Sequence, residues 1–510
     1  MPDTDFVVEM LGIRKEFPGI VANDDITLCL KKGEVHALLG ENGAGKSTLM
    51  SILFGLYQPD VGQIRIRGKD VRIDNPNIAN DLGIGMVHQH FKLVHNFTVT
   101  ENIVLGIEPT SGLVLSLKEA SQRIKTLSQQ YGLNVEPDAR IEDISVGMQQ
   151  RVEILKMLYR NAEVLIFDEP TAVLTPQEIQ DLLKIMRNLI DEGKSIILIT
   201  HKLKEIKAIA DRCTVIRRGK YVGTVEVKDT DEARMAEMMV GRQVSFKVEK
   251  AAREPGAVIL SLRNLCIPCR RKGDPIRIDA LDICAGEIVG VAGVEGNGQT
   301  ELIEALTGLR RIESGSVTLA GKDISDISIR ERNESGLAHI PEDRQKRGLV
   351  LDYSLQENFI LKNHRDAPYS HKGFLNPEAI RAHADKLIAA FDVRSGEGAV
   401  SKARDMSGGN QQKAIIGREF DQNPDLLIAV QPTRGLDVGS IEYIHKRLIE
   451  QRDSGKAVLL VSLELDEILD LSDRIAVLSH GAIVDVVDAA QTNEKEIGLM
   501  MTGVRKEKAA

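Results

Sequence analysis

The sequence predicts an α/β protein made of two similar halves. Short apolar runs such as 35–39, 164–167 and 195–199 alternate with glycine loops and amphipathic stretches, as buried strands alternate with helices in largely parallel sheets. The glycine motif at 40–45 recurs 253 positions later, at 293–298. With 510 residues, of which 42% are hydrophobic, the chain is long enough for several folded domains.

Two offsets relate the halves. The early matches are 253 positions apart, whereas the later ones, beginning with Ser145 and Ser407, are 262 apart. One length change between the two sets explains both numbers, so the halves are copies of one unit. The expected first domain is 1–245, the expected second domain is 257–510, and the polar stretch 246–256 between them is typical of an exposed linker.

Composition limits the classes of function. The 66 basic and 75 acidic residues give a net charge of -9, so we expect no broad cationic surface for nucleic acid. Five cysteines and no secretory start favour a reducing cytosol, and the pair Cys266 and Cys269 is interpreted as coincidence in a loop. No run of 18 apolar residues occurs, so we expect no direct membrane insertion, and any membrane role acts through partners.

The first half contains a motif for binding phosphate. The sequence GENGAGKS fits G-x-x-x-x-G-K-[ST] between the predicted strand 35–39 and a stretch, 49–56, with helical spacing. Its backbone N–H groups can cradle phosphate oxygens, Lys46 can reach the β- and γ-phosphates, and Ser47 can ligate Mg²⁺. The predicted nucleotide-binding residues here are Gly40, Glu41, Asn42, Gly43, Ala44, Gly45, Lys46, Ser47 and Thr48.

Acidic residues follow a later predicted strand of the same half. Asp168 and Glu169 come directly after 164–167, and the carboxyl end of a strand is where an α/β sheet places its ligands. Asp168 is the candidate metal ligand, and Glu169 is the candidate general base for the attacking water. His201 and Gln89 also follow apolar runs, although either residue taken alone is more often structural.

The order of these motifs resembles that of an ATP-binding cassette ATPase over essentially the whole chain. The motifs are the glycine loop, Gln89, 145–149, 168–171 and 200–201, repeated in the second half with 406–413 as a clear signature motif. The resemblance implies two tandem P-loop ATPase domains, each with a RecA-like core, an antiparallel β subdomain and a helical signature subdomain.

By the same resemblance, two cassettes face head to tail, and each ATP lies between one phosphate loop and the other signature motif. Gln89 would sense the γ-phosphate and Mg²⁺ and touch the permease, and His201 would contact the γ-phosphate. Phe17 matches the aromatic residue that stacks on adenine, although a core phenylalanine at the start of a sheet is an equal alternative.

The departures from the family pattern all fall on one of the two composite ATP sites. Cassette 2 has lost the lysine, the acidic pair and the histidine, and cassette 1 has an altered signature motif. The first composite site would add Ser407, Gly408, Gly409 and Asp437 to the complete set of cassette 1. We therefore expect one hydrolytic and one degenerate site per chain, although two chains pairing through like halves is the alternative. The degenerate positions are Gln299, Thr300, Glu342, Val430, Gln431 and Leu463, with Ser145, Val146 and Gly147 as the altered signature.

The resemblance extends to the class of transporter. The second phosphate loop and the segment 341–344 resemble the group that imports monosaccharides and nucleosides, and 86–91 and 431–437 resemble its bacterial nucleoside branch. The resemblance implies ATP and Mg²⁺ as cofactors, two integral-membrane permease subunits and an extracytoplasmic binding protein as partners, and a place on the cytoplasmic face of the membrane. A ribose- or galactose-type importer and a soluble twin cassette acting on ribosomes are the alternatives, and one or two chains per transporter remain open.

Overall fold

The computed structural model describes residues 6–88, 91–111, 114–171, 174, 176–243, 250–251, 254–269, 275–294, 296–501 and 503. The chain divides into two compact units, the first made of residues up to 244 and the second of nearly all residues from 245 on. None of the helices in these ranges is long and apolar enough to cross a membrane.

The first unit is built on one mixed sheet of ten strands. Their order is β5-β4-β1-β2-β12-β11-β3-β10-β9-β6. The strands β1, β2, β4 and β5 pair antiparallel, whereas β3, β6, β9 and β10 pair parallel. The strand bounds are β1 (Phe6–Phe17), β2 (Ile20–Lys31), β3 (Val35–Leu39), β4 (Val61–Ile66), β5 (Lys69–Val71), β6 (Ile84–Val87), β9 (Val164–Asp168), β10 (Ser195–Ile199), β11 (Arg212–Arg217) and β12 (Lys220–Glu226), with a small hairpin of β7 (Thr110–Ser111) and β8 (Val114–Leu115).

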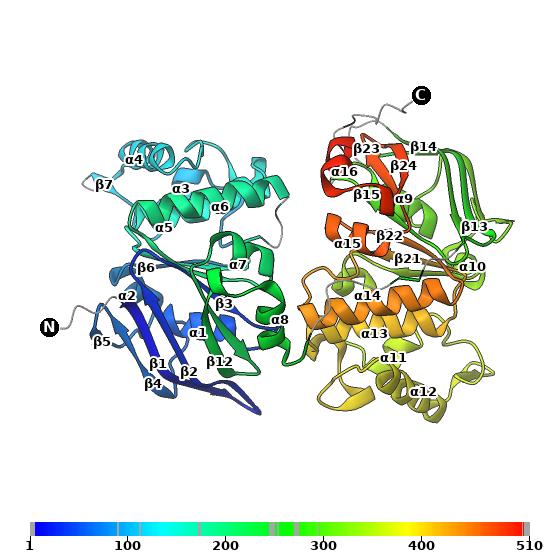
Figure 1. Ribbon diagram of the computed structural model, residues 1–510, viewed down its shortest axis with the longest axis horizontal. Helices are drawn as coiled ribbons and strands as arrows, with labels where there is room; N and C mark the ends of the chain where they lie inside the picture. The colour runs from blue at the N-terminus through cyan, green and yellow to red at the C-terminus, as the bar shows by residue number, and fades with distance from the viewer. Residues whose placement is uncertain are drawn as a thin grey trace. The chain divides into compact units, whose positions relative to one another are not determined.

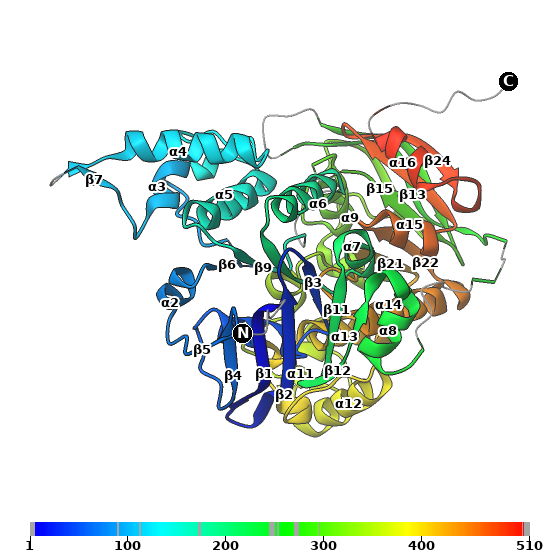
Figure 2. The ribbon, with the colours of Figure 1, turned by 60° about the vertical axis from the view of Figure 1, so that its left-hand side comes forward.

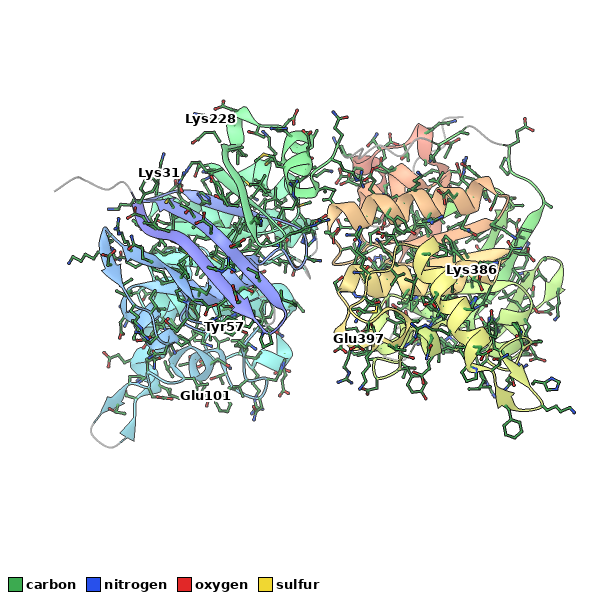
Figure 3. The ribbon with its side chains drawn as sticks, turned by 90° about the horizontal axis from the view of Figure 1, so that it is seen from below. Lys31, Tyr57, Glu101, Lys228, Lys386 and Glu397 are labelled. Atoms are coloured by element: carbon green, nitrogen blue, oxygen red, sulfur yellow. The ribbon has the colours of Figure 1, made fainter. Side chains whose placement is uncertain are left out.

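Three helices of the first unit lie together on one side of it. Figures 1 and 2 show α3, α4 and α5 gathered on the side away from the antiparallel strands β1, β2, β4 and β5. Figure 3 places Glu101 of α3 at the opposite edge of the unit from Lys31 and Lys228. The helix bounds are α1 (Lys46–Leu53), α2 (Pro76–Asp81), α3 (Val99–Val104), α4 (Leu117–Gln130), α5 (Val146–Tyr159), α6 (Pro176–Asp191), α7 (Leu203–Ile209) and α8 (Glu232–Val240).

The second unit repeats this strand order. Its sheet runs β17-β16-β13-β14-β24-β23-β15-β22-β21-β18, which matches the first sheet strand for strand. The strand bounds are β13 (Val258–Ile267), β14 (Ile276–Cys284), β15 (Ile288–Ala292), β16 (Ser314–Leu319), β17 (Lys322–Asp323), β18 (Leu337–Ile340), β19 (Ser370–His371), β20 (Phe374–Leu375), β21 (Leu426–Val430), β22 (Ala457–Val461), β23 (Arg474–Ser479) and β24 (Ala482–Asp488). The helix bounds are α9 (Gln299–Thr307), α10 (Ile329–Glu334), α11 (Leu355–Phe359), α12 (Pro377–Ala390), α13 (Gly408–Asp421), α14 (Val438–Asp453), α15 (Leu465–Leu471) and α16 (Glu494–Met501).

The central strands are covered on both faces. In β3, Val35, Ala37 and Leu39 pack into one hydrophobic cluster, and Leu38 packs into another. Every residue of β3, β9 and β10 is buried. Because neither face meets water, these strands have continuous apolar runs instead of alternating ones, which is why the sequence predicts them well.

Two local predictions are wrong. The helix after the phosphate loop ends at Leu53 and not near Leu56, because Gly55 adopts a left-handed conformation with φ 78° and leaves Leu56 exposed. Cys266 does not lie in a loop. It is buried within β13, where the adjacent Leu265 and Ile267 also belong to the core, and its Sγ lies 3.6 Å from a carboxylate oxygen of Glu313.

Candidate functional site

The glycine loop of the first unit connects β3 to α1 in a shape that excludes side chains. A Cβ atom on Gly40 would lie 2.4 Å from the carbonyl oxygen of Ile216, and one on Gly45 would lie 2.2 Å from that of Ala22. Gly43 and Gly45 have φ values of 81° and 97°, and Gly45 is the N-cap of α1. The loop therefore needs glycine at these positions, and it ends at the amino terminus of a helix, where anions bind.

A buried amide holds this loop in place. Asn23, on β2, is fully buried, and its Nδ2 donates a hydrogen bond of 3.1 Å to the carbonyl oxygen of Gly45. Sequence reasoning missed Asn23, because β2 carries no phosphate motif and only the folded sheet brings this residue beneath the loop.

Lys46 lies inside the loop. Its side chain donates hydrogen bonds of 2.8 and 3.0 Å to the carbonyl oxygens of Gly40 and Glu41, and the residue is only 5% exposed. Burial lowers the pKa of Lys46, although the carboxylates of Glu169 and Asp168 act in the opposite direction. The ammonium group is thus held on neutral carbonyls, and anionic phosphate oxygens would be stronger partners for it.

Asp168 lies beside the first turn of α1. It ends β9, is 7% exposed, and accepts a hydrogen bond of 3.5 Å from the hydroxyl of Ser47. Burial, together with the charge of Glu169, raises the pKa of Asp168 to about 6. A carboxylate and a hydroxyl side by side are hard oxygen ligands of the kind that Mg²⁺ prefers, so this pair fits a metal ion. The next residue of the loop, Thr48, lies in the first turn of α1.

Glu169 and His201 form a pair at the carboxyl ends of adjacent parallel strands. Nδ1 of His201 lies 3.2 Å from Oε1 of Glu169, and the backbone N–H of Glu169 donates to the carbonyl oxygen of Ile199 on β10. Burial alone would raise the pKa of Glu169, but the hydrogen bond and charge of His201, together with Lys46, lower it. Glu169 is therefore an ionised carboxylate that can accept a proton.

Two predicted residues of the first unit, Phe17 and Gln89, remain. Phe17 ends β1 and is partly exposed, with its ring edge-on to Tyr57 at a centroid distance of 5.3 Å. Gln89 lies outside the described residues. The strand before it, β6, ends at Val87.

The two signature segments begin α5 and α13 and differ in their first turns. Ser145 caps α5 by accepting a hydrogen bond from the backbone of Met148, and Val146 projects an exposed apolar side chain there. A Cβ on Gly147 would lie 2.3 Å from the carboxylate of Glu178, so a larger residue here would make that side chain move.

Ser407, the N-cap of α13, is exposed, and its hydroxyl accepts a hydrogen bond of 2.9 Å from the side-chain amide of Asn410. A Cβ on Gly408 would lie 2.7 Å from the guanidinium of Arg344, and Gly409 is buried in the first turn. The first two residues of α13 thus carry no side chain. Asp437 precedes α14 and is partly exposed.

The second unit keeps the backbone of this centre and loses its chemical groups. Gly298 caps α9 with φ 110°, as Gly45 caps α1, but the next residue is the neutral Gln299. Gln431 has φ 49°, close to the 46° of Glu169, and follows Val430, which has no oxygen for a metal ion. The other changed positions are the exposed Thr300 and the partly buried Glu342 and Leu463.

The first unit therefore combines a phosphate-binding loop, a cation within it, a pair of oxygen ligands and a carboxylate held by a histidine. This set has the chemical groups that a P-loop nucleoside triphosphatase needs to bind phosphate and a metal ion and to activate water.

The chain belongs to the ABC transporter family, whose model matches residues 23–172 and 277–434. It is 59% identical to the guanosine import ATP-binding protein NupO of Bacillus subtilis, over 99% of both chains. It is 58% identical to the nucleoside import ATP-binding protein NupA of Lactococcus lactis, over 98% of both chains. The glucose import ATP-binding protein TsgD13 of Haloferax volcanii is 45% identical, with 97% of this chain and 96% of that protein covered.

Proposed function

We propose that this chain is the ATP-hydrolysing subunit of an importer for nucleosides. The observation that carries the proposal is the assembled centre of the first unit, in which Lys46, Ser47, Asp168, Glu169 and His201 lie within one loop and two neighbouring strand ends. The two relatives at 58 and 59% identity are named for nucleoside and guanosine import, whereas the glucose relative is more distant at 45%. This difference favours nucleosides over sugars as the imported class.

The proposed reaction uses the first unit as follows. The loop N–H groups and Lys46 bind the phosphates of ATP, and Ser47 and Asp168 would hold Mg²⁺, which when bound neutralises phosphate charge. Glu169 accepts the proton of the attacking water, and His201 fixes the carboxylate by the 3.2 Å contact. Gln89 and Phe17 are assigned to the γ-phosphate and the adenine ring by the family resemblance.

The signature segment that completes this site is proposed to come from the second half. Its Ser407, Gly408 and Gly409 begin α13 with little side-chain bulk, and Asp437 would join them. In the first half, by contrast, Val146 stands in the signature turn. The degenerate second site would then combine Gln299, Gln431 and the altered signature.

This pairing predicts a difference between two matched variants. Ser407→Arg should reduce ATPase activity at least tenfold, because it places a bulky side chain against the competent site, whereas Ser145→Arg should leave the activity within about twofold. Phosphate release by each purified chain measures the effect. The opposite ranking, with Ser145→Arg inactive and Ser407→Arg normal, would contradict the proposal. It would mean that the signature segment at Ser145 completes the competent site.

The partners are proposed to be two membrane permeases and an external binding protein, with this chain on the cytoplasmic face. Liposomes that contain all the subunits and internal ATP should accumulate labelled inosine or uridine at least tenfold over background, and Lys46→Ala should abolish uptake, because the proposed site supplies the energy. Ribose and galactose provide the comparison. Uptake of sugar alone would refute the nucleoside assignment, and a chain that joins no permease would refute the importer.

A further inference from the structure

An arginine of the second unit lies against the signature segment of that unit. Arg344 follows β18 and begins a single helical turn, Arg344–Gly348. Its guanidinium lies over Gly408, the first residue of α13. A Cβ atom on Gly408 would be 2.7 Å from Nη2 of Arg344, 3.0 Å from Cζ and 3.3 Å from Nε. The edge of the guanidinium that carries Nε and Nη2 therefore faces the signature turn.

The turn that carries Arg344 is capped and closely packed. The side chain of Asp343 accepts hydrogen bonds of 3.0 Å from the backbone N–H groups of residues 345–346. A Cβ atom on Gly348 would lie 2.5 Å from the side chain of Ile415, so the turn also packs closely against α13. The start of the signature helix and the turn thus form one packed structure.

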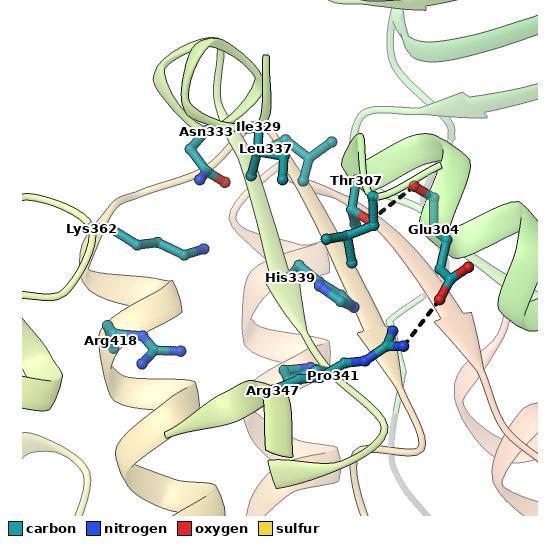
Figure 4. A pocket seen from close by; sticks show the side chains of 11 residues that line it. Glu304, Thr307, Ile329, Asn333, Leu337, His339, Pro341, Arg347, Lys362 and Arg418 are labelled. Carbon is teal, nitrogen blue, oxygen red and sulfur yellow. Dashed lines mark hydrogen bonds and ion pairs between the residues drawn. The ribbon is translucent and has the colours of Figure 1, made fainter. Parts of the chain in front are cut away.

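An ion pair fixes the other end of the same turn. Nη2 of Arg347 lies 3.0 Å from Oε1 of Glu304, a buried residue of α9. Figure 4 shows this contact beside the cavity at His339, which has a volume of about 380 Å³ and is lined by residues from α9 to α13. Because the turn is fixed at both ends, Arg344 is held in place before any ligand binds.

The guanidinium of Arg344 has only part of its hydrogen bonds. Nη1 donates a bond of 2.9 Å to the carbonyl oxygen of Arg434, in the loop that leads to Asp437. Nε is buried and has no hydrogen-bond partner among the described residues. A buried donor without an acceptor is costly. The edge with Nε and Nη2 is also one with which arginine binds a carboxylate or a phosphate through two hydrogen bonds, so this edge fits an anion.

The charges around this edge also favour an anion. Burial lowers the pKa of Arg344, while Asp343 acts to raise it and Arg434 to lower it. The carboxylate of Asp343 is shared with two backbone N–H groups and lies 3.9 Å from the ammonium of Lys346. Arg434 adds a second, exposed guanidinium. These four side chains together carry an excess of positive charge.

The equivalent place in the first unit is apolar. Phe91 occupies the position of Arg344 and packs against the core of its unit. Val146 occupies the position of Gly408, where any Cβ atom would displace a guanidinium. Arginine thus accompanies the signature segment that begins with glycine, and phenylalanine accompanies the one that begins with valine. This difference indicates that Arg344 serves the signature segment and is not needed by the fold that both units share.

We propose that the guanidinium of Arg344 binds the terminal phosphate of the ATP that meets the signature segment 407–409. Two phosphate oxygens would accept from Nε and Nη2, while Nη1 keeps its bond to the carbonyl oxygen of Arg434. The positive charge then stabilises the negative charge that develops as the phosphate leaves ADP. That ATP meets this segment rests on the proposed function. That the segment presents an open arginine edge rests on the contacts of Arg344 itself.

Three variants of the full chain separate a role of the charge from a structural role. Arg344→Met removes every donor, Arg344→Gln keeps a donor for the carbonyl oxygen of Arg434, and Arg344→Lys keeps the charge. At saturating ATP, kcat should fall roughly tenfold or more in the methionine and glutamine variants, and less in the lysine variant. Because Nε has no partner to lose, the melting temperatures should stay near that of the unaltered chain.

Nucleotide affinity provides a second readout. In chains that also carry Glu169→Gln, so that ATP persists, Arg344→Met should weaken ATP binding about fivefold or more. Binding of ADP should stay within about twofold, because ADP lacks the phosphate that Arg344 would contact. Calorimetric titrations with Mg²⁺ present measure both affinities. Lys346→Gln is the matched control: it changes a cation of the same turn whose side chain is 86% exposed, and it should alter neither turnover nor affinity.

Several outcomes would overturn the proposal. They are turnover of Arg344→Gln within about twofold of the unaltered chain, equal losses of ATP and ADP affinity, and a lysine variant no faster than the glutamine variant. A lowered melting temperature together with the last result would assign Arg344 to the structure of the turn alone. If the unaltered chain hydrolyses no ATP, or if Ser145→Arg and not Ser407→Arg abolishes hydrolysis, the proposed function fails, and that outcome is distinct from these.

Discussion

Glu169→Gln is expected to bind ATP normally and to hydrolyse it about 10²- to 10⁴-fold more slowly. The amide has the shape of the carboxylate and can keep its contact with His201, but it cannot accept a proton from water. The variant should hold ATP in a closed state. Phosphate release and retention of labelled ATP after gel filtration measure the two effects, and unchanged turnover would remove Glu169 from the role of base.

The second unit offers a control for this variant. Gln431 has the same left-handed backbone conformation as Glu169, so Gln431→Glu introduces a carboxylate at the equivalent place. Its neighbours are Val430 in place of the metal ligand and Leu463 in place of the histidine. We therefore expect no additional turnover from Gln431→Glu, and a measurable gain would show that the second unit needs only a base.

Lys46→Gln, which gives the first loop the residue of the second, is expected to weaken ATP binding roughly 10- to 150-fold. The estimate corresponds to the loss of a charged hydrogen bond of about 1.5–3 kcal/mol. The loop should still fold, because Gln299 occupies the equivalent position at 8% exposure. Calorimetric titration with ATP and a melting curve test both statements.

Gln299→Ala is the counterpart in the second unit. It removes a neutral amide from a loop to which we assign no role in hydrolysis. The ATPase activity should therefore remain within about twofold of that of the unaltered chain. Equal losses in Lys46→Gln and Gln299→Ala would contradict the assignment of one competent centre, and full ATP affinity in Lys46→Gln would contradict the role of the lysine.

The central sheet could be predicted from the sequence because its strands are mostly apolar and show no alternation with exposed polar residues. The strands at 35–39 and 195–199 have the predicted bounds, and 164–167 extends by one residue to include Asp168. The internal repeat further predicted that the second half would copy the first, and the two strand orders match. The phosphate loop was identified because its residues are consecutive and their spacing is dictated by one short turn before a helix.

The sequence did not reveal contacts that depend on distant segments. Asn23 reaches Gly45 across 22 residues, and the cavity at His339 combines residues from α9 to α13. No sequence periodicity links such positions. The apolar pattern of each element shows only which of its own residues face the core, and not which other elements it meets. The short helix after the loop also ended early, since the conformation of Gly55 outweighed the spacing of the leucines.

The left-handed conformation of Gln431 bears on the history of the second unit. A non-glycine residue with φ 49° costs on the order of 1 kcal/mol, and in the first unit the same conformation directs a reactive carboxylate. The second unit bears the same cost with a neutral amide at this position, so its backbone keeps the shape of the first unit where the side chain differs. A design that rebuilds a catalyst in this half would therefore have to change side chains at Gln299, Val430, Gln431 and Leu463, and could leave the backbone at Gln431 as it is.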